Sequence, residues 1–160
     1  MKKITLFIFL IALVHCKKQG EIHFPNGDSY TGAISNHKPH GKGKLIFSEG
    51  IYIGDFAEGK RSGNGIQTWN KGLHEGEEYI GEWKDDEKSG SGIHTWPDGR
   101  KYNGVWSKNR QNGKGVLTNA KGDSYNGNFL DDLAEGEGIE TKADGTIVHK
   151  GSWLKGKPVK

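Results

Sequence analysis

Two copies of the tetrapeptide Gly-Asp-Ser-Tyr, at residues 27–30 and 122–125, contain the serines of the chain that most resemble nucleophiles. A Gly-Asp-Ser block can carry the reactive serine of an esterase. Here both copies fall in the same turn of an internal repeat, so the repeat explains them without catalysis. The five Gly-x-Gly pairs are not followed by the pattern of a dinucleotide or phosphate loop. We therefore expect no catalytic residue and no cofactor, and an enzyme is only a remote alternative.

Residues that could bind a metal ion are present, but their spacing does not fit a metal site. His37 and His40 have no cysteine or further histidine near them in sequence that would complete a zinc set. The acidic pairs at residues 85–86 and 131–132 lack the pattern of a calcium loop. We interpret both groups as solvated loop residues and predict no metal.

The N-terminal segment has the features of an export signal. Lys2 and Lys3 precede an apolar run at residues 4–14. At about 1.5 Å per helical residue, this run is too short for a bilayer core of about 30 Å. The only cysteine, Cys16, follows directly. The segment 13–16 (LVHC) resembles the lipobox of bacterial lipoproteins, although His15 stands where a small residue is usual. A free thiol at Cys16 is the alternative.

This resemblance implies that residues 1–15 are a signal peptide, helical in its apolar part, and that residues 16–19 are a short linker lipidated at Cys16. The protein would then be exported and lipid-anchored to a bacterial membrane, at the outer membrane or cell surface. Without lipidation it would be periplasmic or secreted. Removing residues 1–15 takes two lysines from the 23 basic residues and leaves 21 beside 20 acidic ones. This balance lacks the clustered positive charge of a nucleic-acid-binding protein.

A repeat organises the remainder of the chain. The motif Tyr-x-Gly recurs at steps of 22, 27, 23 and 23 residues, and a Gly-x-Gly pair begins eleven residues after each tyrosine. The 14 aromatic residues that follow the signal occupy three repeat positions: the tyrosine, the position four residues after it, and the position four residues after the second glycine. They are Tyr30, Tyr52, Tyr79, Tyr102 and Tyr125; Phe56, Trp83, Trp106, Phe129 and Trp153; and Phe24, Phe47, Trp69 and Trp96.

The segments 79–92 (YIGEWKDDEKSGSG) and 102–115 (YNGVWSKNRQNGKG) resemble the MORN (membrane occupation and recognition nexus) repeat, whose pattern is Tyr-x-Gly-x-Trp, a polar loop and Gly-x-Gly. The resemblance extends over residues 20–156, as about five full repeats with partial units at both ends, and leaves 157–160 as a tail. Asn119 and Lys142 depart from the pattern by replacing the second aromatic residue. The resemblance implies a non-enzymatic scaffold that binds or tethers proteins, or alternatively a module that binds phospholipid headgroups.

The alternation within each repeat predicts an all-β fold. Tyr79, Gly81 and Trp83 are spaced by two and should share one face of a strand, and the Gly-x-Gly pair should begin the returning strand of a hairpin. Glycine beside an aromatic residue leaves bare backbone, which a ring from a neighbouring strand can cover. We expect Trp83 to lie in this way over glycine. Tandem hairpins should form an elongated, single-layer antiparallel sheet. Its C-terminal end, with several lysines and Pro158, should discourage further pairing.

A candidate interaction surface follows from the features that vary between repeats. Aromatic residues at the second-strand position occur only in the first half of the chain, and a long acidic turn at residues 73–78 lies between two of them. We expect His94 and Glu140 to point outward. The predicted surface, for an unidentified protein partner, comprises Phe24, Phe47, Trp69, Trp96, His94, His74 and Glu75. For phospholipid headgroups the candidates are the basic loop residues Lys60, Arg61, Lys108 and Arg110.

Overall fold

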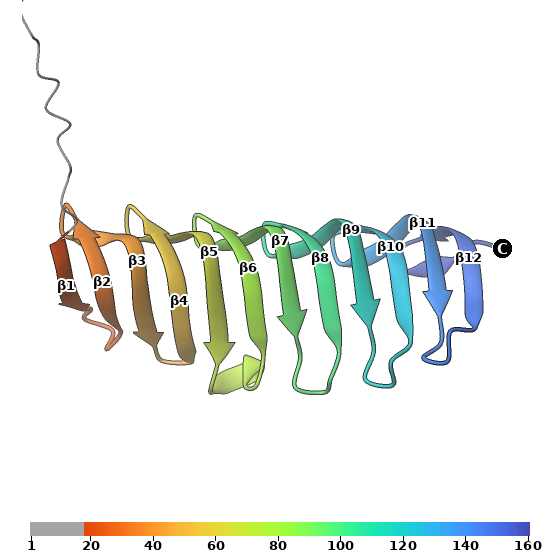
Figure 1. Ribbon diagram of the computed structural model, residues 1–160, viewed down its shortest axis with the longest axis horizontal. Helices are drawn as coiled ribbons and strands as arrows, with labels where there is room; N and C mark the ends of the chain where they lie inside the picture. Colours follow the sequence, from red (N-terminus) through yellow and green to blue (C-terminus); the bar gives the residue numbers. More distant parts are fainter. Residues whose placement is uncertain (1–17) are drawn as a thin grey trace, which may run out of the picture.

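The computed structural model describes residues 18–160 as one antiparallel sheet of 13 strands that follow one another in sequence order (Figure 1). The expected single-layer sheet of tandem hairpins is confirmed. The predicted signal helix and Cys16 lie outside the described residues. The sheet begins at Lys18, so the last two residues of the predicted linker belong to its first strand. No helix within residues 18–160 has the length and apolarity needed to cross a membrane.

The elements in order are β1 (Lys18–His23), β2 (Ser29–Ser35), β3 (Lys38–Phe47), β4 (Gly50–Ala57), β5 (Lys60–Trp69), the 3-10 helix η1 (Gly72–His74), β6 (Glu78–Lys84), β7 (Glu87–Thr95), β8 (Lys101–Ser107), β9 (Arg110–Thr118), β10 (Ser124–Leu130), β11 (Leu133–Thr141), β12 (Ile147–Leu154) and β13 (Lys157–Pro158). Each even-numbered strand from β2 to β10 begins a repeat with its tyrosine, and the next strand returns.

The two kinds of turn explain why polar residues and glycine alternate with the strands. Within a repeat, a two-residue turn joins the strands, and both of its residues have positive φ, as at Asp85 (φ 51°) and Asp86 (φ 72°). Such turns match the twist of a hairpin and favour Asn, Asp and Gly. Between most repeats, longer turns place a glycine at φ close to +90°, as at Gly99, whereas only Ser48 and Glu49 separate β3 from β4. The turn residues of the sequence thus mark the ends of most strands.

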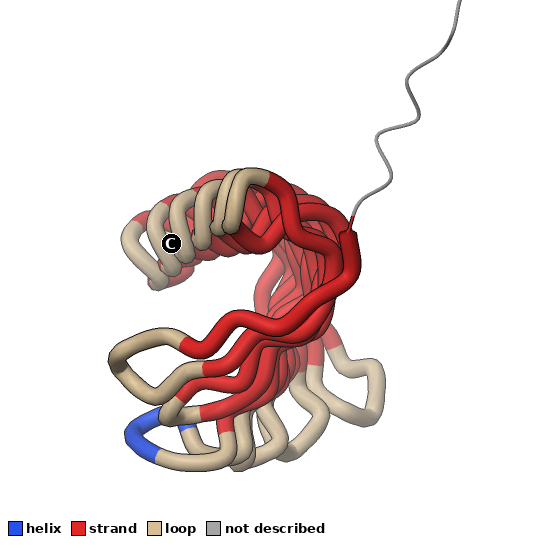
Figure 2. Tube along the Cα trace, turned by 90° about the vertical axis from the view of Figure 1, so that its left-hand side faces the viewer, coloured by secondary structure: helices blue, strands red, loops and turns tan. Residues whose placement is uncertain are grey.

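The sheet is bent along its whole length, which the alternation pattern did not predict. Figure 2 shows a C-shaped cross-section with two arms, one ending in the two-residue turns (the short-turn arm) and one in the longer turns (the long-turn arm). Tyr79 and Trp83 are four residues apart, which is about 13 Å in a straight strand, but their ring centroids are 5.1 Å apart. The strand therefore folds toward the face that carries these rings, called here the inner face.

A row of directly paired glycines follows this bend. Gly81 pairs with Gly92, and Gly92 pairs with Gly104 on the next strand, so that no side chain stands on the inner face at the fold line. The register shifts immediately after Gly81, which marks an irregularity of the kind that bends a strand. The same pairing continues through the sheet, from Gly20 opposite Gly32 to Gly138 opposite Gly151.

The ring that covers each glycine pair comes from the tyrosine of the same hairpin, and not from the tryptophan. A Cβ atom built on Gly92 would lie 2.3 Å from the Tyr79 hydroxyl and 2.6 Å from its ring. The Tyr79 hydroxyl donates a hydrogen bond of 3.0 Å to the carbonyl of Glu82 on its own strand. The glycine that Trp83 faces is Gly63, directly opposite it on β5, and not the glycine pair at the fold line. Tyr30, Tyr52, Tyr102 and Tyr125 repeat the arrangement.

The core is a ladder of alternating rings along the inner face. Trp83 contacts Tyr79 of its own repeat edge to face, and it contacts Tyr52 of the preceding repeat at 5.4 Å. Trp106 contacts Tyr79 and Tyr102 in the same way. Trp83 thus joins its own repeat to the preceding one. Because each ring touches only its neighbours, the repeats stabilise one another in sequence.

Candidate interaction surfaces

Three of the predicted surface residues form one stack on the inner face of the long-turn arm. The imidazole ring of His94 lies between the indoles of Trp69 and Trp96, with ring centroids 5.9 and 4.4 Å apart and planes tilted by only 19° and 18°. β5 ends at Trp69 and β7 ends just before Trp96, so neighbouring returning strands deliver the two indoles. Both indoles are half-buried and pack against the core.

The expectation that His94 points outward is wrong, since its side chain is buried and the residue is only 5% exposed. His94 lies directly opposite Tyr79 on the neighbouring strand, and residues that face each other across a ladder share a face. Glu140 likewise lies opposite Tyr125, so it also belongs to the inner face. Both residues stand two positions after the second glycine of a Gly-x-Gly pair. Side chains at this position lie on the inner face, together with the aromatic rings.

The long acidic turn folds back onto this stack instead of protruding freely. The Glu77 carboxylate, largely buried, accepts a hydrogen bond from His94 Nε2 at 2.7 Å and contacts His74 Nδ1 at 3.0 Å. The His74 ring also lies 5.9 Å from Trp69. The backbone N–H of Gly76 donates to the Trp69 carbonyl and the N–H of Trp69 donates to the Glu77 carbonyl, which closes the turn at its base. Glu75, predicted as part of the surface, is exposed at the tip of the turn.

A buried ammonium group completes this cluster. Lys88 Nζ lies 2.9 Å from His94 Nδ1 and about 5 Å from the ring centroids of Trp69, Tyr79 and Trp106. Burial lowers the pKa of Lys88 to about 8. Burial, reinforced by the charge of Lys88, lowers the pKa of His94 to about 4. A neutral His94 can accept from Lys88 and donate to the carboxylate of Glu77.

A chain of Lys88, His94 and Glu77 has the connectivity of a nucleophile, a base and an orienting carboxylate. The geometry indicates another role here, because Lys88 belongs to the short-turn arm and His94 to the long-turn arm, and their contact joins the two arms of the C. The preceding repeat has an equivalent contact between the two arms, made by other residues. Arg61 bonds Gln67 across the bend and lies over the ring of Trp83 at 4.4 Å.

Sequence analysis missed this bracing although the repeat contains its signal. In repeats two and three the residue two before Gly-x-Gly is a cation, Arg61 or Lys88, and the residue two after the second glycine is a polar ring or amide, His94 or Gln67. The first repeat has Pro39 and Leu45 at these positions, so its inner face is apolar. Polar residues at both of these repeat positions could therefore have indicated a contact between the two arms.

The other predicted residues lie apart from the stack. Phe24 follows β1 and packs against the core, and Phe47 ends β3 and is half-buried. The charged loop residues are mostly paired: Lys60 lies 3.7 Å from Asp85 and Arg110 lies 3.7 Å from Asp131. Lys108 lies in the turn between β8 and β9. The structure thus brings together Trp69, Trp96, His94 and His74, but does not gather the seven residues into one surface.

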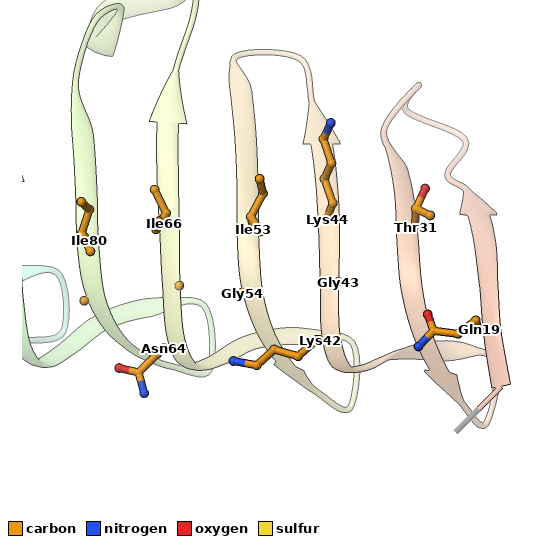
Figure 3. A pocket seen from close by; sticks show the side chains of 12 residues that line it. Gln19, Thr31, Lys42, Gly43, Lys44, Ile53, Gly54, Asn64, Ile66 and Ile80 are labelled. Atoms are coloured by element: carbon orange, nitrogen blue, oxygen red, sulfur yellow. The ribbon is translucent and has the colours of Figure 1, made fainter. Parts of the chain in front are cut away.

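The opposite, outer face carries an exposed apolar row that sequence analysis did not select. Ile53, Ile66 and Ile80 lie directly opposite one another on β4, β5 and β6, and are 55%, 42% and 42% exposed. Figure 3 shows them in one row, with Lys42 and Asn64 in a second row beyond the fold line. Between the rows the floor is glycine backbone. The hollow has a volume of about 640 Å³ and extends over β1 to β6.

The rim of this hollow is polar and nearly neutral. Lys42 forms an ion pair of 2.8 Å with Asp55, whose carboxylate also accepts from the backbone of Asn64. Lys44 extends the apolar row toward β2 and is exposed. The exposed isoleucines and the glycine floor make this hollow suited to apolar contact.

Of the two histidines that we interpreted as solvated loop residues, His37 is exposed, but His40 is a half-buried residue of β3. His37 lies in the turn between β2 and β3, and His40 Nδ1 lies 3.8 Å from a Glu58 carboxylate oxygen. Among residues 18–160, no three histidine, cysteine or acidic side chains converge in the manner of a metal site.

Comparison with known proteins agrees with the repeat. A rice (Oryza sativa subsp. japonica) protein named phosphatidylinositol 4-phosphate 5-kinase 1 is 39% identical over 46 residues, which are 28% of this chain and 6% of that protein. The chain thus spans only a small part of this relative. Among solved structures, the SAS-4 (dCPAP) TCP domain of Drosophila melanogaster, in complex with a proline-rich motif of Ana2 (dSTIL), has a TM-score of 0.40 at 11% identity, covering 91% of this chain and 88% of that one.

The family comparison covers most of the sheet. The family model for the MORN repeat matches five consecutive segments, at residues 30–51, 52–74, 79–99, 102–124 and 125–147. Each matched segment begins at or next to the tyrosine of a hairpin, which the structure places over the glycine pair. The chain therefore belongs to the MORN repeat family.

Proposed function

We propose that this protein is a non-enzymatic scaffold that is exported, anchored to a bacterial membrane through acylated Cys16, and holds a protein partner on the outer face of repeats one to three. The observation that supports the binding surface is the exposed row of Ile53, Ile66 and Ile80 above a glycine floor. Apolar side chains gathered on neighbouring strands and bordered by polar groups are typical of interaction sites.

The outer row suits a partner better than the aromatic stack of the inner face. Trp69 and Trp96 are already stacked on His94, and binding through them would first separate these rings. The outer isoleucines have no such competing contacts to lose, and each is at least 42% exposed. The proposed surface thus lies on the first three repeats, but on the outer face and not on the inner face that carries Trp69, Trp96 and His94.

A site-specific photo-crosslinker at residue 66 tests this surface. We expect it to yield a discrete adduct with one protein in cells that make the native chain. A second variant carries the crosslinker at residue 53 and should give the same adduct. Adding Ile66→Lys to this second variant should abolish the adduct. Ile147 on β12 is 58% exposed and lies outside the hollow, so Ile147→Lys is the matched control. Loss of the adduct with Ile147→Lys, or its persistence with Ile66→Lys in a folded protein, would contradict the proposal.

Binding of phospholipid headgroups is the second candidate, favoured by the match to a plant phosphoinositide kinase. Its predicted cations are poorly placed, because Lys60 and Arg110 pair with acidic residues and Arg61 turns to the inner face. Co-sedimentation with anionic vesicles separates the two functions. Headgroup binding should disappear at about 0.5 M salt, where charges are screened within a few ångströms, whereas apolar protein binding should persist.

Anchoring requires its own experiment. Cells supplied with a labelled fatty acid should incorporate the label into the wild-type protein and not into Cys16→Ala. A mature N-terminus at a residue other than Cys16, or an unlabelled wild-type band, would remove the anchor from the proposal without affecting the binding surface.

A further inference from the structure

The two ends of the sheet are complementary halves of a repeat. β1 is a returning strand, and among residues 18–160 it pairs only with β2. β12 is a first strand of the type His149-x-Gly151-x-Trp153, and its returning strand β13 pairs only with Trp153 and Leu154. One end therefore lacks the strand that would precede it, and the other lacks most of the strand that would follow.

At the β1 end, the inner face lacks a ring. Leu45, in the third strand, has Tyr30 opposite on one side and Tyr52 on the other. Ile22 holds the same repeat position in β1, and has Tyr30 on one side only. A Cβ atom on Gly20 would meet only Ile34, whereas the same atom on Gly43 would meet the ring of Tyr30. A hollow of about 650 Å³ at this edge is lined by residues of β1, by Ile34 of β2 and by the turn between β2 and β3.

At the β12 end, the ring at the tyrosine position faces no neighbouring strand on the open side of β12 within residues 18–160. His149 occupies the repeat position of the tyrosines, and its Nε2 atom is buried without a hydrogen-bond partner within residues 18–160. The same atom lies 3.4 Å from a Cβ atom built on Gly151, so the ring leans over the fold line as the tyrosines do. On β11, the strand that pairs with the closed side of β12, Glu140 lies opposite His149.

We propose that β1 of one chain adds to the open edge of β12 of a second copy, so that chains associate head to tail and continue the sheet. Placing Gly20 opposite Gly151 of the other copy extends the glycine row by one pair. The same register places Ile22 opposite His149, which restores a ring on both sides of Ile22. It also places Glu21 opposite Lys150 on the outer face, where opposite charges stabilise a directly facing pair.

The shapes of the two ends agree with this register in the long-turn arm, where β12 is open and β1 contributes Glu21 to His23. In the short-turn arm the register sets Lys18 opposite Trp153 and Gln19 opposite Ser152. Pro158 and the hydrogen bond from Val159 to Ser152 occupy these positions, so docking of β1 displaces β13 and Val159 from the edge. The expected protection by Lys157 and Pro158 therefore covers one arm of the edge only. A contact between two different surfaces of the same chain leaves one of each free on every pair of copies, so it can repeat and build assemblies longer than a dimer.

Disulfide trapping tests the register on the full chain carrying Cys16→Ser. Facing residues of an antiparallel pair have Cα atoms about 4.5–5.5 Å apart, which a disulfide can bridge. Glu21→Cys combined with Lys150→Cys should give, under oxidation, a ladder of dimers, trimers and longer species. The matched control combines Glu21→Cys with Asn126→Cys, an exposed residue in the same outer row on the interior strand β10. The control should give no ladder.

The outcomes are distinct. Dimers without longer species would indicate pairing of two β1 strands with each other, and would overturn the proposal, as would a ladder of equal intensity in the control. A charge exchange gives a second measurement without cysteine. Glu21→Lys and Lys150→Glu should each weaken association roughly fivefold. An equimolar mixture of the two variants should restore it, because each interface then again has one lysine opposite one glutamate. Failure of the mixture to recover would refute the register even if the single variants fold and weaken.

Discussion

Adding one methyl group at Gly92 tests why this fold combines glycine with large aromatic residues. In Gly92→Ala the new Cβ atom would start 2.3 Å from the Tyr79 hydroxyl and 2.6 Å from two ring carbons. Ordinary contacts between carbon atoms are about 3.5–4.0 Å, so the ring would have to move by about 1 Å. Gly92 does not have the positive φ that disfavours alanine, and the Tyr79 side chain supplies the three atoms nearest to the new Cβ atom.

The expected magnitude is a difference of three contributions. Overpacking in a rigid core costs about 1–3 kcal/mol. Moving the Tyr79 ring also weakens its 3.0 Å hydrogen bond to the Glu82 carbonyl, which contributes about 1 kcal/mol. Replacing glycine with alanine in a permitted conformation returns about 0.4–1 kcal/mol by restricting the unfolded chain. The free energy of unfolding should therefore fall by about 2–3 kcal/mol.

Urea unfolding, followed in parallel by tryptophan fluorescence and far-ultraviolet circular dichroism, measures this change. The same substitution in a Tyr79→Ala background should be close to neutral, because the methyl group then enters the space that the ring has left. Gly145→Ala is the control for backbone strain alone, since Gly145 has φ 89° and open space around it. An equal loss from Gly92→Ala with and without Tyr79, or a loss below about 0.5 kcal/mol, would refute the ring-over-glycine explanation.

Two further predictions concern the rings and the buried cluster. Trp83→Ala should lower the free energy of unfolding by about 3 kcal/mol, since Trp83 is buried between Tyr52 and Tyr79. Leu73 in η1 is 98% exposed, so Leu73→Ala is the control and should change the free energy of unfolding, measured by the same urea titration, by less than about 0.5 kcal/mol. His94 has a pKa of about 4 when folded and about 6.5 when unfolded, so the unfolded chain binds the proton first and stability should fall as the pH drops from about 6.5 to about 4. His94→Gln should flatten the stability profile in that interval, and an unchanged slope would show that His94 is not the titrating group.

The hairpins, their order and the shared face of Tyr and Trp could be predicted because each follows from local spacing. Tyr79 and Trp83 are separated by an even number of residues, and every two-residue turn contains residues that tolerate positive φ. Local pattern also identified the acidic turn as unusual. These features depend on neighbours in sequence or on the adjacent strand, and a repeat displays them several times.

The bend of the sheet could not be predicted, because alternation specifies which face a side chain occupies but not the curvature of the strand. The position of His94 depends on that curvature. In a flat sheet, His94 would be a half-covered residue beside Trp96; in the bent sheet, it reaches Lys88 of the opposite arm at 2.9 Å. Glu77 could not be assigned either, because its contact depends on the path of the long turn back to Trp69.

The turns also show that neighbouring repeats are matched to each other. From the turn between β4 and β5 onward, the second residue of each two-residue turn within a repeat donates its backbone N–H to a carbonyl of the preceding repeat, as Asp86 does to Arg61 and Gly59 does to Pro39. The Asp86 carboxylate also accepts the backbone N–H of Arg61 at 2.9 Å, and Asn109 does the same for the next repeat. Pro39 has no N–H to offer, and the turn that meets it has Gly59, which has no acceptor. A donor left unpaired is costly, and Arg61, Lys88 and Gln111 each meet an Asp or Asn acceptor in the turn of the repeat that follows. Ala134 also has an N–H but meets Gly156 in the last turn, so the match holds between interior repeats and not at the C-terminal edge. The interior MORN units of this chain are therefore alike in frame but matched to their neighbours by the chemistry of these contacts.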